Sequence, residues 1–590
     1  MKRLLVFLLV FMVLASGCLD GNTSTGTPSS TPPEVETAST TSVEQVPPVE
    51  FLYPEKPEIV NLTLEDATEF FQERYSRVSY SQFGNITVNY SGGVFTGVYR
   101  FVLTNFTDRT LYLAVLKTAD EPIKLNITIE GVPLNLSRVD RYILFDEGVG
   151  IEFYAVNVST NLTTLRGVAR YELRHLGNEV YISQMASRGI DFGTDFSCWS
   201  FASKNASITV TLSFPKDTVF VLFRNGVIHS GMKVVYTSPL RPYGGFVLYL
   251  PDLEWKSFEW DGVNFTVYFA SQDYSEAGFG LVQKELTFVM ELYSNLTGIL
   301  PVQKFDVFFV PNLNRILYKR FRWASVGTNR GQVVLVDCRV DIEDSAVNYA
   351  SLLFHEIAHQ WAGHYAWFGY INEPLATFMQ IEAYGRWSPD EYPLWLNNNE
   401  YRTLKYGNEV PFYEVLKDRH RYSYYTSYYT LYWKGAFVIR SLKFMLGDEK
   451  FSEAFRKLFE ECHTSPCNVT AFEGIFEDVS GHELGWFFDE WFNSTLVPNY
   501  TVENLQVLER NSGYNLSFTI VDASNFTMPV PVRVYLENGD YVDETIWVNG
   551  TATVGIELPE RPVKIVIDPY EWMANVNRKF EVEGIGVEVN

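Results

Sequence analysis

Two histidines and a glutamate form a short motif that could hold a metal ion. The segment His355-Glu356-Ile357-Ala358-His359 places two imidazoles four residues apart. On a helix these two positions lie one turn apart on the same face, so both rings can reach one Zn²⁺ ion. Glu356, beside the first histidine, can then take a proton from a zinc-bound water. The alternative is a coincidental pair of histidines on a structural helix.

Glu373 is the candidate for a third zinc ligand. A catalytic zinc with two histidines needs one more protein ligand and an open position for water. Glu373 follows His359 by fourteen residues and precedes Pro374, which suits the first turn of a helix. We therefore expect Glu373 to open a second helix that runs back past the first. His364 lies half a turn away from His355, so we expect it to support the site by packing rather than to bind zinc.

These residues need helices to position them, and the hydrophobic pattern predicts helices around them. Apolar residues recur at helical spacing over 277–293, 346–362, 374–384, 434–446 and 450–461. Upstream, β-branched and alternating residues separated by Gly, Asn and Asp predict a large antiparallel β domain, with strands at 94–103, 111–116, 123–129, 151–158 and 207–214. The last 90 or so residues return to strands, with hairpin signals at Asn538-Gly539 and Asn549-Gly550.

The zinc motif resembles a known family beyond its two histidines. The segment His355 to Trp361, H-E-I-A-H-Q-W, resembles the H-E-x-x-H-Q-W of the aminopeptidase-N-like zinc metallopeptidases (gluzincins). Ile371 to Thr377 is similar to that family's L-N-E-G-F-A-S, and Tyr432-Trp433-Lys434-Gly435-Ala436 to its Y-x-K-G-A. The likeness is clear over about residues 190–500 and looser in the flanking β regions.

The resemblance implies a role for each matching residue. His355, His359 and Glu373 would hold Zn²⁺, Glu356 would be the general base and then the general acid, and Tyr432 would stabilise the oxyanion. Six tyrosines lie between Tyr422 and Tyr432, so the alternative for any one of them is an aromatic wall. The implied fold is a multidomain α+β protein: an N-terminal antiparallel β domain, a thermolysin-like zinc catalytic domain with a helical continuation, and a C-terminal β-sandwich-like domain.

Two departures from the family pattern bear on specificity. The spacer between His359 and Glu373 is thirteen residues, where the family usually has eighteen. Aminopeptidases of the family also carry Gly-x-Met-Glu-Asn, whose glutamate binds the free amine of the substrate. Ser325 to Gly331 stands in that place here without a carboxylate, and Arg330 would repel an ammonium group. An endopeptidase or an otherwise altered specificity is therefore an alternative to aminopeptidase activity.

The N-terminus and the sequons predict an outer surface. A basic start, Lys2-Arg3, precedes twelve apolar residues, Leu4 to Ala15, and Cys18 directly after Ala15-Ser16-Gly17 resembles a lipobox. The alternatives are a plain cleaved signal or an uncleaved N-terminal anchor. In the next stretch, 19–49, 17 of 31 residues are Ser, Thr or Pro, which is typical of a stalk. The chain holds 18 Asn-x-Ser/Thr sequons, far more than chance predicts. We expect a glycoprotein that a lipid tethers to the outer face of the cytoplasmic membrane.

The cysteines and the charge agree with that compartment. Apart from Cys18, four cysteines remain, an even number. Cys462 and Cys467 most simply form a disulfide, the alternative being a metal site through His463. Cys198 and Cys338 are left as a possible second pair by elimination only, and their pairing stays open. With 71 acidic and 47 basic residues, the net charge of −24 argues against nucleic acid as a partner.

Together these features predict the organisation and the function of the chain. The expected parts are a signal peptide at 1–18, a linker at 19–50, a β domain at 51–255, a zinc catalytic and helical region at 256–499, and a β domain at 500–590. The expected function is zinc-dependent hydrolysis of extracellular peptides, aminopeptidase-like by resemblance. The non-enzyme alternative is a glycosylated surface binding protein on a peptidase fold.

Overall fold

The chain divides into two units, Met1–Val49 and Glu50–Asn590. A computed structural model describes residues 49–53, 58–62, 78–91, 94–117, 124–137, 141–145, 150–174, 181–182, 199–201, 203–213, 219–222, 226–229, 233–238, 246–247, 253–270, 273–309, 327–330, 333–336, 349–417, 421–465 and 467–590. The proposed signal and nearly all of the linker lie outside these residues, as do Cys18, Cys198 and Cys338. Among the described residues, no helix is long and apolar enough to cross a membrane.

The N-terminal part consists of β-sheets in which most strands pair antiparallel. In the described part, one sheet has the order β12-β5-β9-β8-β2, with β1 on β9, and a second has the order β16-β13-β3-β4-β10-β6-β7. Two pairs, β2 with β8 and β13 with β3, are parallel and depart from the expected all-antiparallel arrangement. The strands of the first sheet are β1 (Glu50–Leu52), β2 (Glu58–Leu62), β5 (Thr110–Lys117), β8 (Arg141–Phe145), β9 (Gly150–Ser159) and β12 (Trp199–Phe201). Those of the second are β3 (Ser81–Ser91), β4 (Val94–Thr104), β6 (Lys124–Ile129), β7 (Val132–Pro133), β10 (Thr164–Arg174), β13 (Ala206–Ser213) and β16 (Lys233–Ser238).

Alternation explains why these segments are strands. On β4 the side chains of Tyr99, Phe101 and Leu103 are buried, each two residues from the last, as one face of a strand requires. Two short pairs complete this part, β11 (Tyr181–Ile182) with β17 (Phe246–Val247) and β14 (Val219–Leu222) with β15 (Gly226–His229). The five strands that the sequence predicts here are confirmed to within one residue at each end.

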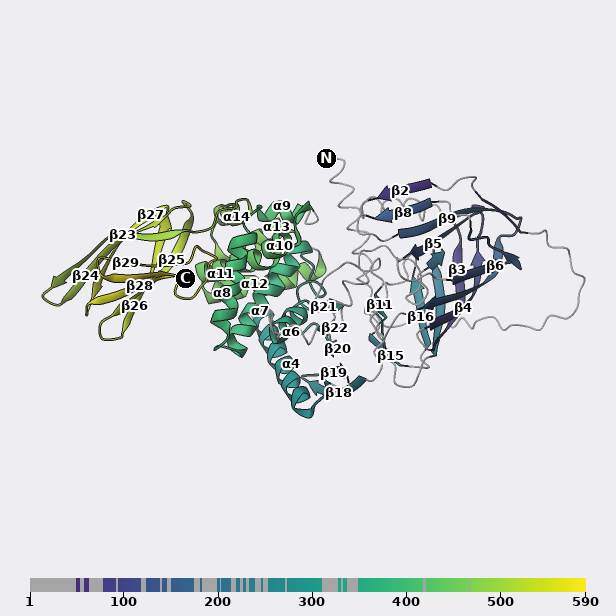
Figure 1. The fold of residues 1–590 in the computed structure, drawn as a ribbon, viewed down its shortest axis with the longest axis horizontal. Helices are drawn as coiled ribbons and strands as arrows, with labels where there is room; N and C mark the ends of the chain where they lie inside the picture. Colours follow the sequence, from purple (N-terminus) through teal and green to yellow (C-terminus); the bar gives the residue numbers. More distant parts are fainter. Residues whose placement is uncertain are drawn as a thin grey trace, which may run out of the picture. The chain divides into compact units, whose positions relative to one another are not determined.

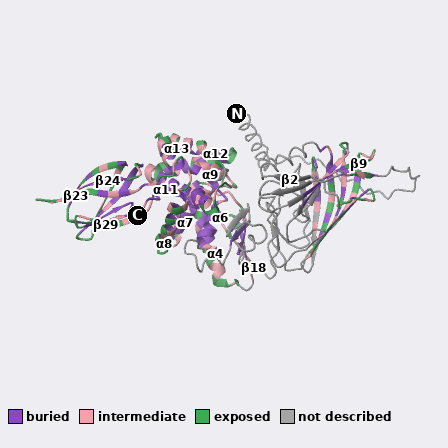
Figure 2. Cartoon of the chain, turned by 45° about the horizontal axis from the view of Figure 1, so that its top comes forward, coloured by how far each residue is buried: buried purple, intermediate pink, exposed green. Residues whose placement is uncertain are grey.

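A mixed sheet and three helices form the part that carries the zinc motif. The sheet has the order β18-β19-β20-β22-β21 (Figure 1), with strands β18 (Leu253–Trp260), β19 (Val263–Ala270), β20 (Lys304–Phe309), β21 (Gly327–Arg330) and β22 (Val333–Val336). The helices are α4 (Glu276–Thr297), α6 (Tyr349–Ala358) and α7 (Asn372–Trp387), and α6 contacts β21, β22, α4 and α7. Every residue of α6 from Ala350 to Ala358 is buried (Figure 2). The first four residues of the zinc motif thus lie on a helix that is packed on all sides.

Helix α4 supports α6 from the side. The hydroxyl group of Tyr293 donates a hydrogen bond to the carbonyl oxygen of Phe354 at 3.1 Å, and the indole Nε1 of Trp361 donates to that of Ile299 at 2.9 Å. The rings of Tyr293 and Trp361 also meet edge to face, with centroids 5.5 Å apart. The end of α6 is therefore anchored by both polar and aromatic contacts just where the two histidines lie.

A helical region and a C-terminal sheet follow. The further helices are α8 (Tyr392–Tyr406), α9 (Phe412–Lys417), α10 (Tyr424–Tyr428), the π-helix η5 (Tyr429–Lys434), α11 (Gly435–Leu446), α12 (Asp448–Thr464), α13 (Val469–Ser480) and α14 (Gly485–Phe492). Hydrogen bonds join the last strands in the order β23-β24-β27-β26-β25-β28-β30-β29. These are β23 (Tyr500–Arg510), β24 (Gly513–Asp522), β25 (Thr527–Leu536), β26 (Tyr541–Asn549), β27 (Thr551–Leu558), β28 (Pro562–Ile567), β29 (Arg578–Val582) and β30 (Ile585–Val589). The α+β class, with sheets on both sides of a helical region in the chain, is confirmed, and so are both predicted hairpins.

A disulfide joins Cys462, at the end of α12, to Cys467. The sequence-based prediction of this bridge is confirmed, and it leaves neither sulfur free to bind a metal together with His463.

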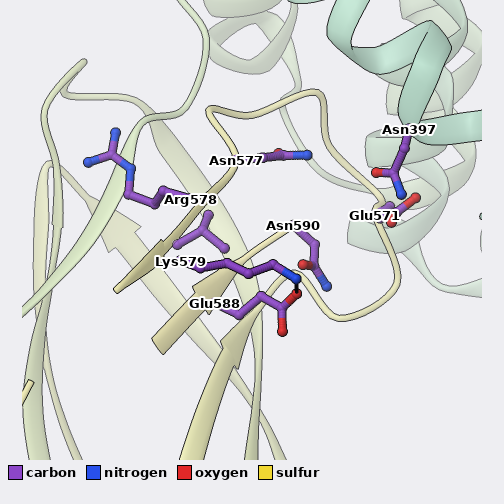
Figure 3. Close-up of a pocket in the computed structure, with 8 residues that line it drawn as sticks. Asn397, Glu571, Asn577, Arg578, Lys579, Glu588 and Asn590 are labelled. Atoms are coloured by element: carbon purple, nitrogen blue, oxygen red, sulfur yellow. Dashed lines mark ion pairs between the residues drawn. The ribbon is translucent and has the colours of Figure 1, made fainter. Parts of the chain in front are cut away.

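A buried polar network joins the helical region to the C-terminal sheet. The Glu400 carboxylate on α8 accepts hydrogen bonds from the backbone N–H of Asn575 at 3.2 Å and from the side chain of Asn577 at 3.3 Å. Asp568 accepts from the backbone N–H groups of Trp572 and Met573 at 3.0 and 2.9 Å. Burial raises the pKa of Glu400 to about 8 and that of Asp568 to about 7. Beside this junction lies a pocket of about 390 Å³ (Figure 3), lined by Asn397, Glu571, Asn577, Arg578, Lys579, Glu588, Val589 and Asn590.

These raised pKa values predict that the protein loses stability as the pH rises from about 5 to 8. A carboxyl group whose pKa is higher in the folded than in the unfolded state stabilises the fold below its unfolded pKa, and that contribution disappears as the pH passes the folded pKa. For Glu400 the full effect is at most about 5 kcal/mol, because each unit of pKa corresponds to about 1.4 kcal/mol. In Glu400→Gln the melting temperature should fall less between pH 5 and pH 8 than in the wild type. The exposed Glu453 offers the control Glu453→Gln, which should behave as the wild type does. Equal pH dependence in all three proteins would contradict the prediction.

Candidate metal centre

The two histidines come from the last turn of α6 and the turn that follows it. The sequence predicts one helix over 346–362, but α6 ends at Ala358. After Ala358 the chain forms a turn with 3₁₀-type hydrogen bonds, in which an N–H group bonds to the carbonyl oxygen three residues back. The N–H groups of Gln360 and Trp361 bond in this way to Ile357 and Ala358. His359 nevertheless stays one turn beyond His355, and their Nε2 atoms lie 3.2 Å apart.

Each histidine is oriented by a second contact through its ring. The Nδ1 atom of His359 lies 3.0 Å from the carbonyl oxygen of Ala362, so this nitrogen carries the proton and Nε2 is left for a metal. His355 makes a side-chain hydrogen bond with Gln380, a buried residue two turns along α7 from Glu373. Hydrogen bonds of this kind fix the tautomer and the ring plane of a metal ligand.

Glu373 meets the histidines from the first turn of α7. Its Oε2 atom lies 3.4 Å from Nε2 of His355 and 3.3 Å from Nε2 of His359. The three atoms therefore form a nearly equilateral triangle with edges of 3.2 to 3.4 Å. Ligands about 2.05 Å from a tetrahedral zinc ion lie roughly 3.3 Å from one another. Oε2 is buried and has no hydrogen-bond partner, so the triangle fits one face of a zinc tetrahedron.

The charges at this cluster also suit a cation. Burial would raise the pKa of Glu373, but His359 and His355 hold it well below its usual range. Burial opposes protonation of His359, yet the Glu373 carboxylate outweighs this and raises the pKa of that imidazole to about 9. Burial lowers the pKa of His355. A partly buried carboxylate that stays ionised beside two imidazoles is the arrangement that a divalent cation satisfies.

Within the described residues, His355, His359 and Glu373 form a group that could hold a metal ion. These are the three ligands that the sequence predicts, and the fold brings them together. His364 is not in the group: its side chain is exposed and its backbone N–H donates to the carbonyl oxygen of His359 at 3.1 Å. Glu356 is buried on α6 and close enough to His359 to favour the charged form of that ring.

Tyr432 lies against the metal group from the π-helix η5. Its ring stacks on the ring of His355, with centroids 5.7 Å apart and planes 19° from parallel. On its other side is Tyr428, with ring centroids 4.6 Å apart. Short π-helical segments are rare and occur often at functional sites. The ring of Tyr432 is thus in direct contact with one of the candidate metal ligands.

The Lys434-Gly435 pair that follows Tyr432 has a packing role. An added Cβ atom at Gly435 would lie 2.7 Å from Cγ of Pro374, the neighbour of Glu373. Any larger residue would therefore push α11 away from α7 and the zinc ligand. Lys434 is fully buried, and its ammonium group donates to the carbonyl oxygen of Ser494 at 3.0 Å, while burial lowers its pKa to about 8.

Strand β21 carries the segment that stands in place of Gly-x-Met-Glu-Asn. It pairs antiparallel with β22, with Arg330 opposite Val333, and β21 contacts α6. Arg330 therefore lies on the edge strand beside the zinc-motif helix. The residues Ser325, Val326 and Gly331 lie outside the described part of the chain.

The sequence analysis missed Gln380, which supports His355. Its only sequence signal is its place seven residues after Glu373 on the same helix face. Without the tertiary structure, that spacing does not distinguish it from any other polar residue of α7.

Comparison with known proteins places this geometry in a family. Residues 290–491 match the peptidase family M1 domain, and the match contains every residue of the metal group together with Glu356 and Tyr432. This segment of the chain is therefore similar to the peptidase family M1 domain. The matched segment begins within α4, ends within α14 and includes α6, α7 and η5.

Curated proteins that are similar to this chain are aminopeptidases. The chain is 24% identical to the aminopeptidase M1-D of Oryza sativa subsp. japonica over 351 residues, which is 57% of this chain and 39% of that protein. It is 22% identical to the alanine/arginine aminopeptidase of Saccharomyces cerevisiae over 410 residues, 65% of this chain and 46% of that one. The chain thus spans less than half of either relative.

A solved structure shows the same fold. Aminopeptidase A of Legionella pneumophila, in a complex with aspartic acid, superposes with a TM-score of 0.51 at 14% identity. The match covers 86% of this chain and 60% of that one, so it extends from the M1 domain into the flanking sheets.

Proposed function

We propose that this chain is a zinc-dependent peptidase that hydrolyses peptide bonds by Glu356-assisted attack of water. The observation that carries the proposal is the triangle of two Nε2 atoms and one carboxylate oxygen with edges of 3.2 to 3.4 Å. Glu356 lies next to this triangle on α6, and Tyr432 lies across the ring of His355.

The chemistry follows from the arrangement of these residues. Zn²⁺ at this site would supply a Lewis acid that polarises a peptide carbonyl and lowers the pKa of a coordinated water. Glu356, a buried carboxylate, takes the proton of the attacking water and passes it to the leaving amine. The phenol of Tyr432 donates a hydrogen bond to the oxyanion that forms on the carbonyl. Gln380 and the Ala362 carbonyl hold the imidazoles in place.

Aminopeptidase-like activity is the specificity that we propose. The names of the relatives support it, since they are aminopeptidases. Arg330 supports the second candidate, an endopeptidase or an altered specificity, because it lies on β21, where the family carries an amine-binding glutamate. In that case the guanidinium group would meet a backbone carbonyl or a carboxylate of the substrate.

We also propose that the enzyme acts outside the cell, tethered by a lipid at Cys18 or by an N-terminal anchor. The basic and apolar start and the Ser/Thr/Pro-rich stretch support this. The sequons add support: of those whose asparagine side chain is described, all but Asn499 and Asn515 expose it. Exposed asparagines are open to glycosylation. Mass spectrometry of the native protein that found neither glycans nor a lipid would overturn this part of the proposal.

Zinc content and a paired peptide library test the function and its specificity. We expect about one zinc per chain, hydrolysis that a chelator stops and added zinc restores, and faster cleavage of free than of N-acetylated peptides. Because the usual glutamate is absent, this preference should be modest, about tenfold. Arg330→Glu should increase the preference for free peptides. Arg330→Gln should give a preference between that of the wild type and that of Arg330→Glu. Equal cleavage of both substrates would favour the endopeptidase candidate, and a purified chain without zinc or activity would leave only the non-catalytic alternative.

A further inference from the structure

The chain between the metal ligands crosses from α6 to α7 in a short segment, 363–371, that includes the 3₁₀ turn η3 (Gly369–Ile371). The backbone N–H groups at the start of this segment each donate a hydrogen bond. Those of Gly363, His364, Tyr365 and Ala366 bond to carbonyl oxygens of residues 359–366. The N–H of Phe368 bonds to the side chain of Asn372 at 2.9 Å. The N–H of Trp367 differs from these, because its partner lies almost 100 residues away.

That partner is the disulfide-closed end of α12. The N–H of Trp367 donates to the carbonyl oxygen of Cys462 at 3.4 Å, and its own carbonyl oxygen accepts from the N–H of Cys467 at 2.9 Å. The peptide of Trp367 thus lies between the two bridged cysteines and bonds to both. The indole of Trp367 is 44% exposed, so the backbone, not ring burial, holds this residue.

His463, between the cysteines, makes a second attachment. Its ring stacks on Tyr365 with centroids 4.0 Å apart and planes 7° from parallel, and its Nδ1 lies 2.9 Å from the carbonyl oxygen of Tyr365. Two residues of the connecting segment, Tyr365 and Trp367, are therefore held by one small loop. We refer to Cys462, His463 and Cys467 as the α12 clamp.

The position of the clamp matters because Glu373 depends on this segment. His355 lies on α6 and His359 in the turn that follows, where Tyr293 and Ile299 provide contacts. Glu373 lies at the start of α7, directly after the connection that the clamp holds. Trp367 precedes Glu373 by six residues, and Phe368 packs on Phe459 of α12 with ring centroids 5.3 Å apart. A disulfide restricts the conformations of the loop that it closes. Opening it frees the ends that bond to Trp367.

We propose that the disulfide-closed α12 clamp is a positioning element for the metal site, which holds Glu373 against His355 and His359 and thereby sets the affinity for zinc. This inference rests on the proposed function only in assuming that zinc is the metal. It assigns a role to Cys462, His463 and Cys467, none of which touches the metal group.

Zinc affinity of the full chain tests the proposal. The dissociation constant is measured by competition with a chromophoric chelator in the wild type and in the double variant Cys462→Ser/Cys467→Ser. We expect the variant to bind zinc about 10- to 100-fold more weakly, the range seen when groups that orient metal ligands are removed. The exposed Glu453 lies on the same helix, so Glu453→Ala should bind as the wild type does.

A second variant covers the case in which the double variant does not fold. His463→Ala keeps the disulfide and removes only the ring stack and the Nδ1 contact with Tyr365, and zinc should bind about tenfold more weakly, at the low end of that range. An unchanged dissociation constant in a folded clamp variant, with tight binding in the wild type, would overturn this inference and leave the proposed function standing. A wild type that binds no zinc would overturn both.

Discussion

Replacing Glu356 with glutamine should lower kcat/KM for peptide hydrolysis by about 10³-fold. Glutamine has the shape of glutamate but cannot take a proton from the attacking water, and general base catalysis typically contributes 10²- to 10⁴-fold. Glu356 is not one of the three atoms of the metal triangle, so the zinc content should remain near one per chain. The measurement is steady-state hydrolysis of the best peptide in the library, with zinc determined on the same sample.

Two controls make this result interpretable. Glu373→Gln should lose both zinc and activity, because it removes the charge of a ligand. Glu356→Gln should lose only activity. If the Glu356 variant retained more than a tenth of the wild-type rate, another group would have to act as the base, and the proposed mechanism would be wrong.

Replacing Tyr432 with phenylalanine should lower kcat by about 10²- to 10³-fold with little change in KM. The variant removes one hydroxyl group and keeps the ring that stacks on His355, so the loss reports the hydrogen bond to the oxyanion. Removal of a single donor to an oxyanion costs about that much in known enzymes. The kcat and KM values of the purified variant, compared with those of the wild type, provide the measurement.

Tyr428 offers the matched control. It lies in the same aromatic row, 4.6 Å from Tyr432 between ring centroids, and accepts a hydrogen bond from Trp433 at 3.4 Å. Tyr428→Phe should retain most of the activity, because its hydroxyl group already accepts a hydrogen bond from the indole of Trp433. An equal loss of kcat in the two variants would instead indicate that both tyrosines act by packing that shapes the site, and not by a hydrogen bond to the oxyanion.

Some of the site could be predicted from local spacing alone. The ligands His355 and His359 follow from their separation by four residues, and the start of α7 beside Glu373 follows from Pro374. Helix α4, the strands β4 and β5, and both C-terminal hairpins also agree with their patterns, because periodicity and turn residues act over a few neighbours. The end of α6 was predicted four residues too late, since nothing in the apolar pattern marks the turn at His359.

The role of Gln380 and the π-helix at Tyr432 could not be predicted from local spacing. Each acts through a neighbour that is distant in the sequence: Gln380 through His355, and Tyr432 through the same ring. The requirement for glycine at position 435 follows only from the tertiary structure, in which Pro374 leaves no room for a Cβ atom.

The sequence by itself determined which side chains could bind a metal, because chemistry and helical spacing are local properties. Only the tertiary structure shows that the carboxylate of Glu373 lies against the two histidines and how the short connection before it is held in place. That connection is held by backbone hydrogen bonds and a ring stack from the α12 clamp. Such contacts arise when elements pack their buried faces together, so they depend on the whole fold and leave no trace in the spacing of nearby residues.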